Sequence, residues 1–95
     1  MKHCILAKYT SEAYARREVL LPRIREIFSA ASDISGVHGA EVFPNCVDRE
    51  NRYDVLIRLD MDAEALPRYD ISAMHHLWKN EFGPLLEKKA IFDYE

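Results

Sequence analysis

The sequence has few cysteines, no long apolar run and no excess of basic charge, and each shortage excludes a class of protein. Cys4 and Cys46 are too few for a disulfide scaffold and lack zinc-site spacing, so we expect two reduced thiols. No apolar run approaches the roughly 20 residues of a membrane span. The net charge of −3 argues against nucleic-acid binding, because phosphate affinity requires a concentrated basic surface.

The first residues also lack the charged, apolar and small-residue regions of a signal peptide, because a strand-like segment, KHCILAKY, begins at residue 2. We therefore expect a cytoplasmic protein with no membrane partner. Its 95 residues are 48% hydrophobic and 31% charged, which is typical of one globular domain spanning residues 1–95. Arginines cluster at residues 16–25 with glutamates interleaved, which favours a solvated helix face over an anion site.

Apolar spacing and turn signals predict the order β-α-β-β-α-β, with no repeat or linker. The predicted strands are 3–9, 37–43, 53–61 and 90–94. A TSEA capping signal and apolar residues at helical spacing predict a first helix that ends before Gly36, either kinked at Pro22 or starting there. A short helical piece at 62–66 is expected to stop at Pro67. A longer helix at 72–88 is expected to be disturbed at Gly83-Pro84.

This order favours an α+β fold: a ferredoxin-like βαββαβ protomer whose four-stranded antiparallel sheet has its helices on one face. The second face should then be polar, but apolar residues are expected there too. They are Cys4, Leu6, Ala40, Val42, Leu56, Phe92 and Tyr94. A sheet that is apolar on both faces needs a second cover. The sequence therefore predicts a homodimer through the sheet face, forming a dimeric α/β barrel.

The adjacent histidines His75 and His76 should point in different directions. On a helix with about 3.6 residues per turn, Ile71, Met74, Trp78, Phe82 and Leu85 form one apolar stripe. His75 is spaced to lie within this stripe. His76, rotated by roughly 100°, falls on the polar side. We therefore expect His75 to point inward and His76 to face solvent.

An inward imidazole needs hydrogen-bond partners, and the strands offer His3 and Asp93. If Phe92 and Tyr94 face a dimer partner, Asp93 must face the helices, where a carboxylate is costly unless paired. Asp93 accepting from one ring nitrogen of His75 would leave the other nitrogen free as a base. The alternative is a purely structural hydrogen bond between these two side chains.

Three segments resemble the stress-responsive dimeric α/β-barrel (Dabb) family. They are KHCILAKY at the start, YDISAMHHLWKNEFGPLL in the last third and IFDY at the end. The resemblance covers essentially the whole chain in order and spacing. It implies a ferredoxin-like protomer whose sheets pair into a dimeric barrel. The chain is also similar to the family's olivetolic acid cyclase-like polyketide cyclases, which close linear chains by aldol condensation without a metal or organic cofactor.

The resemblance to these cyclases implies catalytic roles for four residues. His75 matches the general base, and Tyr69 matches a tyrosine whose hydroxyl stabilises the enolate. His3 matches a pocket histidine on the first strand, and Asp93 matches an aspartate that orients the base. The residues expected to bind substrate are Ile5, Ala7, Trp78, Phe82 and Ile91, although Trp78 and Phe82 also fit a purely core role. We expect no metal and no cofactor.

Several functions remain open at this point. The first is a cofactor-independent lyase or cyclase that acts on a small carbonyl or phenolic compound, with His75 as general base. A cofactor-free monooxygenase or isomerase is a variant that rests on fold analogy. The second is a non-catalytic stress-response or ligand-binding dimer. The third, metal binding through His3, His75 and a carboxylate, has suitable ligands but no recognised spacing.

Overall fold

The computed structural model describes residues 1–95 and has the expected order of strands and helices. The strands are β1 (Lys2–Tyr9), β2 (Val37–Pro44), β3 (Val55–Met61) and β4 (Leu86–Tyr94). The helices are α1 (Ser11–Tyr14), α2 (Arg17–Phe28), α3 (Leu66–Asp70) and α4 (Ala73–Phe82). Short 3₁₀ turns occupy Ala31–Asp33, Ala63–Ala65 and Gly83–Leu85.

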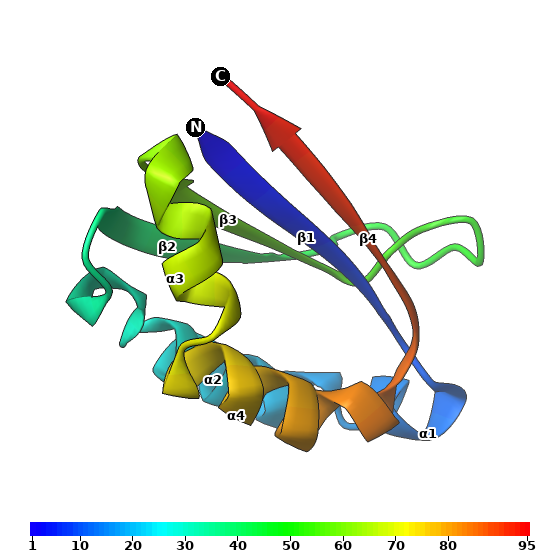
Figure 1. Ribbon diagram of the computed structural model, residues 1–95. Coiled ribbons are helices and arrows are strands. Elements are labelled where there is room, and N and C mark those ends of the chain that lie inside the picture. The colour runs from blue at the N-terminus through cyan, green and yellow to red at the C-terminus, as the bar shows by residue number, and fades with distance from the viewer.

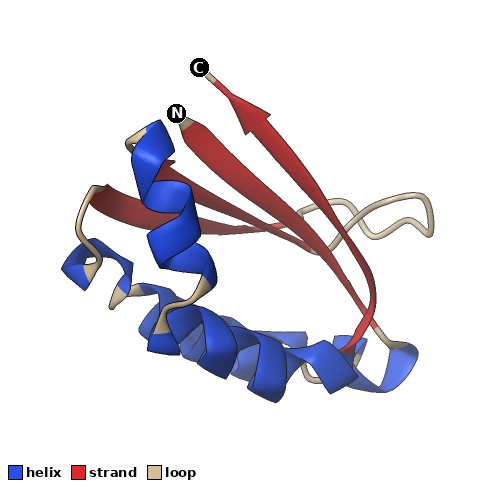
Figure 2. Cartoon of the chain, viewed as in Figure 1, coloured by secondary structure: helices blue, strands red, loops and turns tan.

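The strands form one antiparallel sheet in the order β2-β3-β1-β4. All helices lie on one face of this sheet, and the opposite face, called the open face below, carries no helix (Figures 1 and 2). Because β1 and β4 are neighbours, the two chain ends lie side by side (Figure 1). No helix has the length and apolar character needed to span a bilayer.

The core lies between the sheet and the helices, and it follows the expected periodicities. Alternate residues of β3, Val55, Ile57, Leu59 and Met61, are buried, as the period-2 pattern requires. Trp78 of α4 stacks on Phe82, with ring centroids 5.0 Å apart, and meets the edge of Phe28 from α2. These aromatic contacts join the two long helices beneath the sheet.

Two boundaries near prolines differ from the expectation. The last helix ends at Phe82 instead of residue 88, and β4 begins at Leu86 instead of residue 90. The reason is strand pairing, because Leu86 already pairs with Tyr9 of β1. Pro67 does not stop a helix but lies in the first turn of α3, where a missing N–H costs nothing.

The expected orientation of β2 is also wrong. Val42 pairs with Ile57 and Ala40 pairs with Leu59, so both face the helices, whereas Phe43 lies on the open face. The register shift between Val37 and Gly39 sets this orientation. The apolar residues of the open face are therefore Cys4, Leu6, Phe43, Leu56, Ala90, Phe92 and Tyr94.

Most arginines of the cluster are exposed, as expected, and two of them also contact other elements of the fold. Arg23 of α2 holds Glu81 of α4 through two hydrogen bonds, of 2.6 and 2.7 Å. Arg25 donates to the backbone carbonyl of Val42 on β2 at 3.1 Å. These contacts fix α2 against α4 and the sheet, and they leave neither arginine free to bind an anion.

Candidate functional site

One pocket of about 330 Å³ lies between the β1–β4 edge of the sheet and the α3–α4 segment. All four residues expected to be catalytic line it: His3, Tyr69, His75 and Asp93. We call it the histidine pocket. Its further lining includes Ile5, Trp78 and Ile91, which were expected to bind substrate. The roles of all these residues remain predictions.

Two of the expected substrate-binding residues do not line the histidine pocket. Ala7 and Phe82 are fully buried within the hydrophobic core. Ile71, which was assigned to the apolar stripe of α4, precedes that helix and is 77% exposed. The stripe therefore begins at Met74. The helical period fails at Ile71 because the turn between α3 and α4 interrupts it.

Asp93 pairs with His3 and not with His75, which corrects the expected pairing. The two residues are cross-strand neighbours on β1 and β4, and His3 Nδ1 lies 2.5 Å from Asp93 Oδ1. Because a carboxylate only accepts, Nδ1 of His3 donates. His3 is 6% exposed and Asp93 lies at the more open rim. His3 therefore lies at the floor of the pocket, and its partner Asp93 lies at the mouth.

His75 obtains its hydrogen bond from the backbone instead. Its Nδ1 lies 2.9 Å from the carbonyl oxygen of Asp70, at the end of α3. A carbonyl only accepts, so Nδ1 carries the hydrogen and the neutral ring keeps a lone pair on Nε2. Burial, with a further contribution from Lys79 and Lys89, holds the pKa of His75 below its usual value. The ring is therefore neutral at pH 7.

The position of His75 follows from local helix chemistry. Ser72 is the N-cap of α4, and its hydroxyl oxygen accepts from the backbone N–H of His75 at 3.1 Å. The same hydroxyl donates to the carbonyl of Tyr69 at 2.8 Å, which links the two helices. His75 is half-buried and His76 is exposed, as the helical spacing predicts.

Tyr69 lies between the two pocket histidines. Its ring centroid is 4.5 Å from that of His75 and 5.3 Å from that of His3. It is 1% exposed, and its hydroxyl has no hydrogen-bond partner. Burial raises the pKa of Tyr69 well above its usual value, so the phenol stays protonated. An unpartnered buried hydroxyl is costly and uncommon, which marks it as a candidate donor to a ligand.

The sequence reasoning missed three groups at this pocket. They are the carbonyl of Asp70, the capping side chain of Ser72, and the lysines Lys79 and Lys89 at the rim. Ser72 had a recognisable signal, because a serine before a helical pattern is a common N-cap. The other two groups had none, since their position depends on how α3, α4 and β4 pack.

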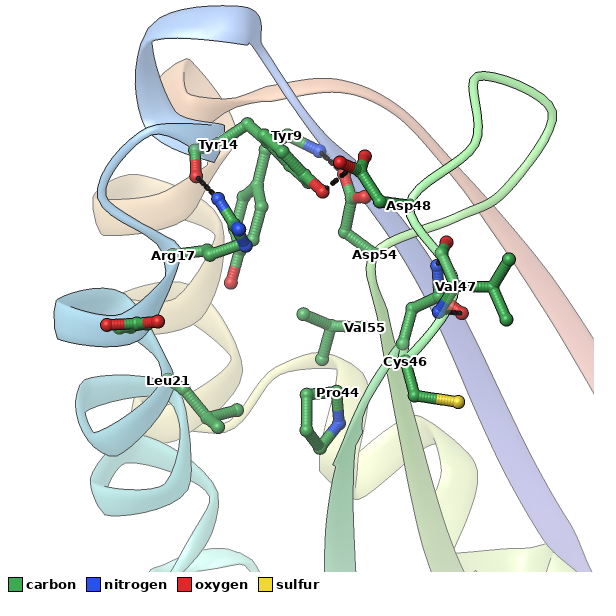
Figure 3. A pocket seen from close by; sticks show the side chains of 12 residues that line it. Tyr9, Tyr14, Arg17, Leu21, Pro44, Cys46, Val47, Asp48, Asp54 and Val55 are labelled. Atoms are coloured by element: carbon green, nitrogen blue, oxygen red, sulfur yellow. Dashed lines mark hydrogen bonds between the residues drawn. The ribbon is translucent and has the colours of Figure 1, made fainter.

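A second pocket, of about 310 Å³, lies at the other end of β1 beneath the loop of residues 45–54. We call it the tyrosine pocket, after Tyr9 and Tyr14 in its lining. The Tyr14 hydroxyl donates to Asp48 at 2.7 Å and so ties the loop to α1 (Figure 3). The carboxylate of Asp54 accepts from the backbone N–H of Tyr9 at 2.8 Å (Figure 3).

The polar groups of the tyrosine pocket are mostly committed to the fold. Arg17 donates to the carbonyl of Tyr14 at 3.0 Å, and its guanidinium lies 4.2 Å from the centroid of the Tyr14 ring. The Tyr9 hydroxyl is buried without a partner, and burial raises its pKa to about 12. No histidine lines this pocket, and two of its carboxylates, Asp48 and Asp54, already accept hydrogen bonds from the fold.

The side chains do not form a metal centre. No group of three or more histidine, cysteine, aspartate or glutamate side chains is placed to hold an ion. His3, His75 and Asp93 share the histidine pocket, but they do not belong to any such group. Both cysteines are free, Cys4 buried and Cys46 exposed.

No protein-family model and no curated protein sequence matches the chain. Solved structures do match it. A dimeric protein of unknown function with a ferredoxin-like fold, from Bacteroides fragilis, aligns with a TM-score of 0.81 and 20% identity. The alignment covers 99% of this chain and 93% of that one. The chain has the ferredoxin-like fold.

Two other neighbours carry more specific descriptions. One is a Dabb family protein from Mesorhizobium loti, with a TM-score of 0.73 and 20% identity over 99% of this chain and 93% of that one. The other, from Bacteroides thetaiotaomicron, is described as a possible oxidoreductase. Its TM-score is 0.67, with 17% identity over 98% of this chain and 95% of that one. At these identities the likeness supports the fold and no particular activity.

Proposed function

We propose that this protein is a homodimer that binds a small carbonyl or phenolic compound in the histidine pocket and removes a proton from it with His75. The observation that carries this proposal is the hydrogen bond from His75 Nδ1 to the carbonyl of Asp70. It fixes the tautomer and leaves Nε2 as the basic atom. The lowered pKa of His75 keeps that atom unprotonated at neutral pH.

The groups around His75 suit proton abstraction next to a carbonyl. The carbonyl carbon chain would lie against Ile5, Trp78 and Ile91. As the C–H proton moves to Nε2 of His75, negative charge develops on the carbonyl oxygen. The protonated and unpartnered hydroxyl of Tyr69 is the donor that would stabilise this enolate. His3, held by Asp93, would position the ligand from the pocket floor beside Tyr69.

Removal of such a proton is the first step of an aldol-type cyclase or lyase, and it needs no cofactor. This is the activity implied by the resemblance to the olivetolic acid cyclase-like branch of the Dabb family. The Mesorhizobium loti neighbour, described as a Dabb family protein, supports the fold that this proposal requires. The oxidoreductase description of the Bacteroides thetaiotaomicron neighbour favours a second candidate, a cofactor-free monooxygenase. That reaction also begins with deprotonation of a phenolic compound.

The test is hydrogen–deuterium exchange at the acidic CH₂ groups of diethyl 3-oxoglutarate, a neutral β-keto diester, followed by NMR in D₂O. We expect the protein to accelerate exchange above the buffer rate. His75→Gln should lose about 10²-fold or more of this acceleration, as is usual for a general base. His76→Gln is the matched control, because His76 is the exposed neighbour on the same helix. Equal exchange rates in both variants would exclude His75 as the base.

The homodimer is proposed to form through the open face of the sheet. Phe92 is 64% exposed there, and Phe43 and Tyr94 are each 40% exposed. Phe92 and Tyr94 lie on β4 at one edge of the sheet, and Phe43 lies on β2 at the other edge. An exposed apolar surface of this kind is typical of an association surface. The Bacteroides fragilis neighbour is described as dimeric, which supports a dimer without indicating its interface.

Light scattering at micromolar concentration tests the dimer. The wild-type protein should have twice the mass of one chain, and Phe92→Glu should lower that mass by placing a charge in the interface. Val19→Glu is the control, because Val19 is an exposed apolar residue on the helix side. If Phe92→Glu stays dimeric, the open face is not the interface.

A further inference from the structure

Two lysines stand at the mouth of the histidine pocket, and they come from different elements. Lys79 lies on α4, and Lys89 lies on β4, where it pairs with Ala7 and therefore faces the helix side of the sheet. Both line the pocket beside Trp78 and Ile91. Neither takes part in any of the ion pairs or side-chain hydrogen bonds of the protein. Two cations without an acidic partner therefore share one rim.

A second hollow on the surface beside the rim is lined by the same two lysines. A hollow of about 240 Å³ adjoins the histidine pocket and shares Trp78, Lys79 and Lys89 with it. It extends toward Gly83 and Leu86, at the start of β4. The shared residues combine the flat apolar ring of Trp78 with the two ammonium groups. The two hollows therefore meet at Trp78 and the two lysines.

The positive charge of the two rim lysines affects the pKa of His75. After burial, the proximity of Lys79 and Lys89 is a further cause of the lowered pKa of His75, opposed only by Asp70. The other carboxylate of the pocket, Asp93, is already engaged by His3. The carboxylate of Asp70 also lines the pocket without an ion-pair partner, so an anionic group on the ligand would meet two unpaired lysines and one unpaired carboxylate.

We propose that Lys79 and Lys89 form a subsite for an anionic group, so that the ligand of the histidine pocket is a carbonyl compound bearing a carboxylate or a phosphate. This inference rests on the proposed function, because it assigns the charge of the ligand in the same pocket. The reactive carbonyl end lies against His75 and Tyr69, whose rings contact each other. The anionic end lies outside Trp78, between the two ammonium groups.

Two matched pairs of probes separate charge from shape. The first pair is monoethyl and diethyl 3-oxoglutarate, which differ by one carboxylate. The second pair is monoethyl and diethyl (2-oxopropyl)phosphonate, which differ by one phosphonate charge. Binding of all four is measured by calorimetry at roughly 0.01 M and 0.15 M salt, where the Debye length falls from about 30 to 8 Å. The proteins are wild type, Lys79→Gln, Lys89→Gln and the double variant.

Lys88→Gln is the control for net charge. Lys88 borders the adjoining hollow, but its ammonium lies 5.4 Å from the centroid of the Tyr53 ring. Circular dichroism melts check that every variant is folded. We expect one anionic probe of a pair to bind about tenfold more tightly than its diester at low salt. Each single variant should lose about threefold of this preference, the double variant should lose it entirely, and Lys88→Gln should retain it.

The outcomes are distinguishable from failure of the proposed function. A preference confined to the carboxylate pair or to the phosphonate pair supports the subsite and identifies its source. Equal binding of anion and diester, with deuterium exchange still dependent on His75, overturns the subsite while the proposed function stands. Absence of binding by all four probes together with absence of exchange overturns both. A preference that is lost equally in Lys88→Gln also overturns the subsite, because it then reflects only net charge.

Discussion

A buried tyrosine hydroxyl without a hydrogen-bond partner lies near each end of β1, but the surroundings of the two hydroxyls differ. At one end, Tyr69 lies between His3 and His75, and His75 is neutral and half-buried. At the other end, Tyr9 lies among groups that already bond to one another and to the backbone. An unpartnered hydroxyl therefore identifies a candidate site only where a base with an unengaged ring nitrogen lies beside it.

The carboxylates of the two pockets differ in a similar way. In the histidine pocket, Asp93 holds a buried imidazole at the pocket floor. In the tyrosine pocket, Asp48 holds an exposed phenol and Asp54 holds a backbone N–H. The first arrangement positions a group that can contact a ligand. The second joins the loop of residues 45–54 to the body of the protein, and we interpret it as structural.

The largest difference between the two pockets should appear in the exchange rate when each unpartnered tyrosine hydroxyl is removed. Tyr69→Phe should slow the exchange reaction by about 10²-fold, because the enolate loses its donor. Tyr9→Phe should leave the rate unchanged. Both variants should be as stable as wild type or more stable by up to about 1 kcal/mol, because each loses a buried unsatisfied group. NMR exchange and urea unfolding measure the two quantities. A rate loss in Tyr9→Phe would remove the distinction between the pockets.

A smaller effect is expected from the two carboxylates. Asp93→Ala should lower the free energy of unfolding by about 1–3 kcal/mol, because it leaves the buried His3 ring without its partner. Asp48→Ala should lower it by less than about 1 kcal/mol, because its bond to Tyr14 is exposed. Urea unfolding at pH 7 compares the two variants. Equal losses would mean that the His3–Asp93 pair contributes no more than a surface contact.

The smallest effect concerns pH. Burial lowers the pKa of His75 in the folded protein, so below the ordinary histidine value of about 6.5 the unfolded chain binds more protons than the folded one. The free energy of unfolding should therefore fall as the pH is lowered through 6.5, and His75→Gln should show a shallower fall. The exchange rate should rise with pH to a plateau whose midpoint lies below 6.5. Identical stability profiles for wild type and His75→Gln would show that burial does not perturb this ring.

The sequence alone determined those features that depend on neighbouring residues. Period-2 alternation placed Val55, Ile57 and Leu59 on the buried face of β3, and the helical period turned His75 inward and His76 outward. Both follow from backbone geometry that repeats every few residues. The order of these segments was also sufficient for the ferredoxin-like fold, because short antiparallel connections leave few alternatives.

Only the tertiary structure decided what depends on register between distant segments. The pairing of His3 with Asp93 joins residues from the two ends of the chain, and it exists because β1 and β4 align these two positions. The register shift in β2 likewise turned Val42 to the core. Lys79 and Lys89 meet at one rim only because α4 packs beside the edge strand. A local pattern fixes which way a side chain points, whereas its partner is set by the packing of the whole chain.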